Sequence, residues 1–139
     1  FLPEGVITRA GIAIAKRSYQ IFQERGFSSI IMPAGLRGSY HLTELAGAKV
    51  IFTLNTRVQD MVLEEDPVQE ERIGIPVQQD IIDKLMQIPE FVRAYEPDGM
   101  KPADYITLGV VQKLLSQFTE TGWAPLETYR SKKVSKRWI

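Results

Sequence analysis

The stretch Ile30-Ile31-Met32-Pro33-Ala34-Gly35-Leu36-Arg37-Gly38-Ser39 decides the predicted fold. An apolar run leads into a turn of small residues with one arginine, and a helical pattern that Ser39 can cap begins directly afterwards. The first amides of a helix lack partners within the helix, and the helix dipole places partial positive charge beside them. The two glycines let a ligand approach the backbone, and the planar fork of Arg37 suits phosphate oxygens. The stretch therefore predicts a phosphate or carboxylate site in an α/β protein.

The surrounding sequence alternates between helical and extended patterns. Apolar spacing predicts helix, strand, helix, strand and helix over residues 6–25, 27–33, 40–46, 48–53 and 56–65. Thr8 or Gly5 is expected to cap the first helix, Gly26 to stop it, and Asn55 or Thr53 to cap the last. Short strands joined through helices lie parallel, and such connections are right-handed.

The second half of the sequence shows helical patterns and no predicted strand. A polar loop over residues 66–76 leads to a helical pattern over 77–95, which Pro89 breaks. We therefore divide the chain into residues 1–65, which contain the predicted strands and the turn, and residues 66–139, a helical region with a tail.

The last predicted helix starts at Pro102, a residue that favours the first helical position, and ends at Gly122. The sequence beyond it is increasingly basic, and we expect a surface tail anchored by Trp123 and Tyr129. The basic residues of this tail are Arg130, Lys132, Lys133, Lys136 and Arg137.

Composition narrows the classes of function. The 139 residues balance 17 basic against 17 acidic side chains, which argues against a nucleic-acid or membrane-surface partner. The chain has no cysteine and one histidine, so a protein-only zinc site is not expected. No apolar run approaches the roughly 20 residues of a membrane span. We expect a cytoplasmic protein without metal or cofactor.

Two predicted strands are too few for an independent sheet, and their open edges would pair with other chains. We therefore expect the chain to be part of a larger α/β protein. On its own it should self-associate or bind the part of the sheet that it lacks.

The stretch from Gly26 to Leu63 resembles the transaldolase family. The resemblance is carried by the segments Met32–Gly38, Leu45–Ala48 and Thr53–Leu54, and by a later segment, Phe91–Met100. It implies the C-terminal part of a (β/α)8 TIM barrel, with strands 7 and 8 and their helices, followed by C-terminal helices. It also implies transfer of a dihydroxyacetone unit between sugar phosphates through a lysine Schiff base, in the pentose phosphate pathway.

The resemblance assigns the substrate phosphate to Arg37, with Ala34, Gly35 and Gly38 in the same turn. Glycine replaces the serine of the family pattern at residue 35 and its asparagine at residue 38. No lysine of this chain matches the Schiff-base lysine, so the resemblance implies no catalytic residue here. We therefore expect the isolated chain to be inactive, although the full-length enzyme would be a transaldolase.

Interpretations of the same residues that involve no specific function stay open. Arg37 can pair with a carboxylate, and the glycines can be ordinary turn residues. His41 has no partner spaced to orient it for catalysis. The acidic residues between 64 and 71 lack the spacing of metal ligands and are expected in solvent. The second hypothesis of function is accordingly a non-catalytic phosphosugar-binding or assembly fragment.

Overall fold

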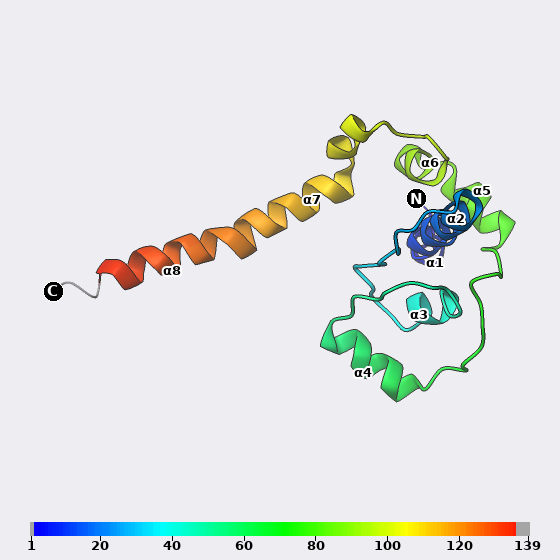
Figure 1. Ribbon diagram of the computed structural model, residues 1–139, viewed down its shortest axis with the longest axis horizontal. Coiled ribbons are helices and arrows are strands. Elements are labelled where there is room, and N and C mark those ends of the chain that lie inside the picture. The colour runs from blue at the N-terminus through cyan, green and yellow to red at the C-terminus, as the bar shows by residue number, and fades with distance from the viewer. Residues whose placement is uncertain (1, 136–139) are drawn as a thin grey trace. The chain divides into compact units, whose positions relative to one another are not determined.

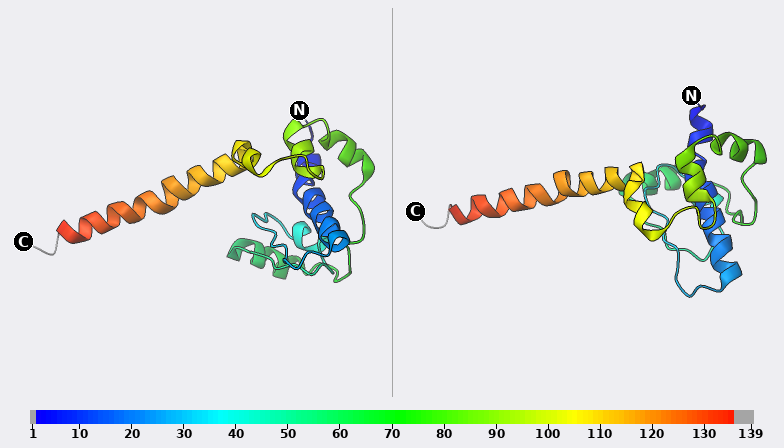
Figure 2. Two further views of the ribbon diagram at one scale, coloured as in Figure 1. Left: turned by 45° about the horizontal axis from the view of Figure 1, so that its top comes forward. Right: turned by 90° about the horizontal axis from the view of Figure 1, so that it is seen from above.

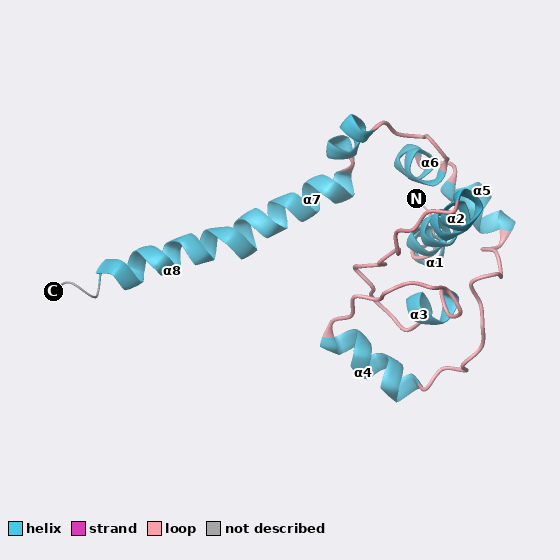
Figure 3. Cartoon of the chain, viewed as in Figure 1, coloured by secondary structure: helices cyan, strands magenta, loops and turns pink. Residues whose placement is uncertain are grey.

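The computed structural model describes residues 2–135, and the side chains among them up to Tyr129. The chain divides into two compact units, Phe1–Pro97 and Asp98–Ile139. Figure 3 shows helices and loops throughout the described range, in which no residue belongs to a β-strand.

The first unit consists, as far as it is described, of helices joined by loops (Figure 1). These helices are α1 (Glu4–Ile7), α2 (Ala10–Arg25), α3 (Tyr40–Glu44), α4 (Thr56–Glu65), α5 (Gln79–Leu85) and α6 (Pro89–Tyr95). Gly26 ends α2 in the left-handed conformation, with a φ of 64°, as predicted. The Asn55 side chain caps α4 by accepting a hydrogen bond from the Val58 amide at 2.9 Å, so this cap is also confirmed.

The predicted start of the first helix is wrong. The helix breaks at Thr8 and Arg9, between α1 and α2. Thr8 lies at the C-terminal end of α1 and does not cap a helix start, because its hydroxyl donates to the Gly5 carbonyl at 3.1 Å. Pro89 does interrupt the second helical pattern as predicted, and it begins α6.

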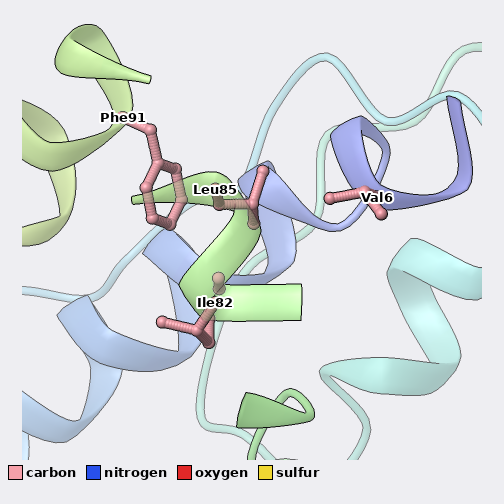
Figure 4. Packing of buried hydrophobic residues seen from close by; sticks show 5 residues of the cluster. Val6, Ile82, Leu85 and Phe91 are labelled. Atoms are coloured by element: carbon pink, nitrogen blue, oxygen red, sulfur yellow. The ribbon is translucent and has the colours of Figure 1, made fainter. Parts of the chain in front are cut away.

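The core of the first unit forms where four helices meet. It consists of Val6 from α1, Ala13 from α2, Ile82 and Leu85 from α5, and Phe91 from α6. Figure 4 shows the labelled side chains converging, and Leu85 is fully buried. Burying a side chain of this size stabilises the fold by about 1.5–3 kcal/mol. The cluster fixes α2 against α6 and α1 against α5, as the views in Figure 2 show.

The predicted α/β fold, with strands 7 and 8 of a TIM barrel, is wrong, because the described chain contains helices and no sheet. The two segments expected as strands do lie beside one another. The Ile51 amide donates to the Ile31 carbonyl at 3.1 Å, and the Thr53 amide donates to the Pro33 carbonyl at 3.3 Å. Both bonds advance by two residues along each segment, so the segments run in the same direction.

Pro33 gives a physical reason why this pairing does not become a ladder. A parallel ladder alternates donors from both segments, and here residue 33 would have to donate to the Ile51 carbonyl. Proline has no amide hydrogen. The apolar strands of parallel sheets are covered on both faces, whereas Ile30, Met32 and Ile51 are about half exposed.

The second unit contains a 3-10 helix followed by a long helical run. Its elements are η1 (Pro102–Thr107), α7 (Gly109–Gln117), the π-helical segment η2 (Phe118–Trp123) and α8 (Ala124–Ser135). Pro102 begins a helical element as predicted, but this element is the short η1, and the extended Leu108 separates it from α7 where one continuous helix was expected. The predicted stop at Gly122 is wrong, because this residue lies inside η2 and the helix continues.

The predicted anchoring of the tail is also wrong. Trp123 and Tyr129 remain 61% and 58% exposed. The side chains from residue 130 onward, which include the predicted basic tail, lie outside the described residues. Between residues 98 and 129 the structure buries Leu108 alone. A bilayer-spanning helix is not found in the described part of the chain, since none has the required length and apolar content.

Candidate functional site

The four predicted site residues lie in one turn, residues 34–38, at the end of the paired segments. Gly35 has a φ of 71°, a conformation that side chains with a Cβ rarely adopt. A Cβ at Gly38 would lie 2.5 Å from Cε1 of Tyr40, so a side chain at this position requires the Tyr40 ring to shift. Leu36 is buried and anchors the turn, whereas Ala34 and Arg37 face solvent. The backbone conformation therefore favours glycine at residue 35, and the present position of the Tyr40 ring favours it at residue 38.

The Arg37 side chain has no hydrogen bond or ion pair with any residue in the described range. Its backbone amide donates to Nδ1 of His41 at 3.4 Å, a long bond. The amides of Gly35 and Gly38 likewise donate to no acceptor of the described chain. The turn thus presents one exposed guanidinium beside backbone donors, which is the chemistry of an anion site.

His41 lies directly behind this turn. Its ring stacks on Tyr40 with 4.2 Å between centroids, and the Arg9 guanidinium lies over Tyr40 at 5.8 Å. Burial of the ring, together with the positive charges of Arg9 and Arg37, lowers the pKa of His41, although a backbone hydrogen bond at Gly38 opposes the shift. The ring is therefore neutral at pH 7, which lets Nδ1 accept from the Arg37 amide.

Ser39 does not have its predicted role. Its hydroxyl donates to a Glu65 carboxylate oxygen, and no side chain caps the start of α3. Helix α3 has only five residues, so its dipole contributes little. An anion at the turn would therefore be held by Arg37 and the turn amides, and Glu65 adds a negative charge on the Ser39 side.

A second charged cluster, which the sequence analysis missed, surrounds Glu44 at the end of α3. One carboxylate oxygen contacts Arg9 at 3.3 Å and Arg72 at 3.2 Å, and the other contacts Lys16 at 2.9 Å. Burial alone raises the pKa of Glu44, but the hydrogen bonds and charges of Lys16 and Arg72 bring it below its ordinary value. Each of the three cations is 28 or more positions from Glu44 in sequence, so no local spacing pattern could reveal the cluster.

Lys16 is the most enclosed cation of this cluster, with a side chain that is 9% exposed. Besides Glu44, its ammonium donates to the carbonyls of Arg72 at 3.0 Å and Ile75 at 2.6 Å. Three acceptors satisfy its three donors, so Lys16 is not placed as a nucleophile. It ties the loop of residues 72–75 to α2.

A pocket of about 510 Å³ lies in the same unit, between α2, the loop that Lys16 holds and α5, and it contains none of the predicted site residues. Among the described residues, no group of three histidine or acidic side chains is arranged to hold a metal ion. Comparison of the chain with protein-family models, with curated proteins and with solved structures gave no match.

Proposed function

We propose that the turn of residues 34–38 binds the phosphate group of a sugar phosphate, and that the chain is the phosphate-binding segment of a transaldolase-like enzyme. The observation that carries the proposal is the exposed Arg37 guanidinium, which has no protein partner in the described range. The exposed Gly35 adds an amide that has no acceptor among the described residues, and the amide of the buried Gly38 also lacks one. The hydrogen bonds from Ile51 and Thr53 support the preceding segment and so fix the position of the turn.

The resemblance to transaldolases supports the choice of a sugar phosphate over other anions. In that family an arginine of the corresponding turn binds the substrate phosphate, and Arg37 is the matching residue. The Schiff-base lysine has no counterpart here, so the proposed role is binding and orientation of the substrate. The cytoplasmic location expected from the sequence stays part of this proposal.

A non-catalytic phosphosugar-binding module is the second candidate. Gly38 favours it, because a Cβ at this position would meet the Tyr40 ring. The asparagine of the family pattern would therefore require the Tyr40 ring to move from its present position. Both candidates place the phosphate on Arg37 and differ in whether covalent chemistry follows.

Calorimetric titration with fructose 6-phosphate and with inorganic phosphate tests the shared claim. A charged hydrogen bond is worth about 1.5–3 kcal/mol, so Arg37→Ala should weaken binding by about 10- to 150-fold. Arg57→Ala is the matched control, because Arg57 is an exposed arginine of the same unit on α4. Equal affinities of the wild type and Arg37→Ala would remove the proposed site.

Borohydride trapping separates the two candidates. The isolated chain with a ketose phosphate should give no covalent adduct under either proposal. A longer protein that contains this chain should give an adduct on a lysine outside residues 1–139 if it is a transaldolase. An adduct on Lys16 would contradict the role assigned to that residue.

A further inference from the structure

The pocket beside α2 has the composition of a ligand site. Its volume of about 510 Å³ lies within the range of small-molecule pockets, which are mostly apolar with a few polar groups. Ala13 and Ile82, both buried in the core, form part of its lining, and Val77 and Pro76 add apolar surface. The polar side chains that line it are Lys16, Arg17, Tyr19, Gln20, Gln23, Gln79 and Tyr95.

The charged side chains in this lining are all positive. The lining includes two cations, Lys16 and Arg17, and no carboxylate. The ammonium of Lys16 is occupied by Glu44 and two carbonyls, so it shapes the wall by holding the loop that contains Ile75. Arg17 is different: the residue is partly buried, and its guanidinium makes one hydrogen bond to the described residues, an exposed bond to the neutral Gln20 amide oxygen at 3.1 Å.

An accessible guanidinium without a carboxylate partner among the described residues, next to an apolar surface, suits a ligand that has an anionic group and an apolar body. The anionic group would replace solvent at Arg17, with Gln23 and the hydroxyls of Tyr19 and Tyr95 as additional polar groups. The apolar part would cover Pro76 and Val77, where removal of apolar surface from water adds to affinity. A strongly polar sugar phosphate would leave that apolar surface unused.

We propose that this pocket binds a small organic anion with an apolar body, such as an aryl phosphate or aryl carboxylate, with its charged group on Arg17. The site is separate from the turn of residues 34–38 and shares no residue with it. It does not depend on the proposed sugar-phosphate function. The 72–75 loop forms part of its wall, and Lys16 holds this loop through hydrogen bonds to the carbonyls of Arg72 and Ile75.

Calorimetry with phenyl phosphate, inorganic phosphate and phenol tests the proposal. Phenyl phosphate should bind more tightly than either of the other two probes, because it alone carries both parts. Arg17→Gln removes the charge and keeps most of the side-chain length, and it should weaken phenyl phosphate binding by about 10-fold or more. Far-ultraviolet circular dichroism checks that this variant retains its helices.

The two sites are separated by crossed variants. Arg37→Ala should leave phenyl phosphate affinity unchanged, and Arg17→Gln should leave fructose 6-phosphate affinity unchanged. Arg57→Ala, outside both sites, should bind both ligands as the wild type does. Equal phenyl phosphate affinity in the wild type and Arg17→Gln would overturn the proposal, as would loss of that binding in Arg37→Ala.

Discussion

At the scale of single residues, the Glu44 carboxylate joins three cations from distant parts of the first unit. Glu44→Gln would remove the counter-charge of the enclosed Lys16 ammonium, because a neutral amide replaces the carboxylate. We expect the free energy of unfolding at pH 7 to fall by about 1–3 kcal/mol, as measured by urea denaturation. Asp80→Asn is the control, because the Lys84–Asp80 pair is exposed and contributes at most about 0.5 kcal/mol.

The same carboxylate predicts a pH dependence. The pKa of Glu44 is below its ordinary value of 4.5 in the folded chain, so its ion pairs stabilise the fold above that value. This stabilisation is lost as the pH falls through the folded-state pKa. The difference in unfolding free energy between the wild type and Glu44→Gln should therefore shrink between pH 5 and pH 3. A difference that stays constant over this range would contradict the assigned ion pairs.

The pKa of His41 depends on the charge at the turn of residues 34–38. Its pKa is lowered chiefly by burial, with contributions from Arg9 and Arg37. A phosphate bound at Arg37 adds negative charge nearby and should raise the pKa of His41 toward its ordinary value of 6.5. Arg37→Ala should raise it as well, without further change when phosphate is added. Nuclear magnetic resonance titration of the His41 ring protons measures both effects, and a pKa unaffected by phosphate in the wild type would argue against binding there.

At the scale of elements, the Asn55 cap is the clearest local determinant of a helix. Asn55→Ala removes the acceptor for the Val58 amide and should destabilise α4 by about 1 kcal/mol. In Asn55→Ala, amide hydrogen exchange should be faster in the first turn of α4 than in α2. Asn55→Asp keeps the acceptor and should preserve the protection, and equal exchange in Asn55→Ala and the wild type would contradict this role.

The same scale explains which features could be predicted from the sequence. Gly26, Asn55, Pro89 and Pro102 act through their own backbone or one nearby amide, so a single sequence was enough to place them. A strand, by contrast, forms only where another segment of chain pairs with it. The apolar run that ends at Pro33 reads as a buried strand, but its pairing supplies only two hydrogen bonds in the described structure.

In the candidate site, too, some features could be predicted from the sequence and others could not. The turn at Arg37 was recognisable because its glycines and arginine are neighbours in the sequence. The Glu44 cluster and the pocket at Arg17 were not, because each joins α2 to loops and helices far along the chain. Only tertiary packing brings those groups together.

At the scale of the whole molecule, exposed apolar surface is the main feature. The described part of the second unit exposes seven large apolar side chains along its helical run: Val110, Leu114, Leu115, Phe118, Trp123, Leu126 and Tyr129. Surfaces of this kind associate, so we expect the average mass by light scattering to rise with concentration. Phe118→Glu should weaken this association. A stable monomer at high concentration would contradict the expected self-association.

The central claim is that the turn of residues 34–38 holds a phosphate group. Its most direct test is a titration of the isotope-labelled chain with fructose 6-phosphate, followed through the backbone amide signals and the Arg37 side-chain signal. We predict that the signals of Gly35, Arg37 and Gly38 shift together with one dissociation constant in the wild type and in Arg57→Ala, and do not shift in Arg37→Ala. Signals of the turn that stay unchanged at saturating ligand, or that shift equally in Arg37→Ala, would contradict the claim.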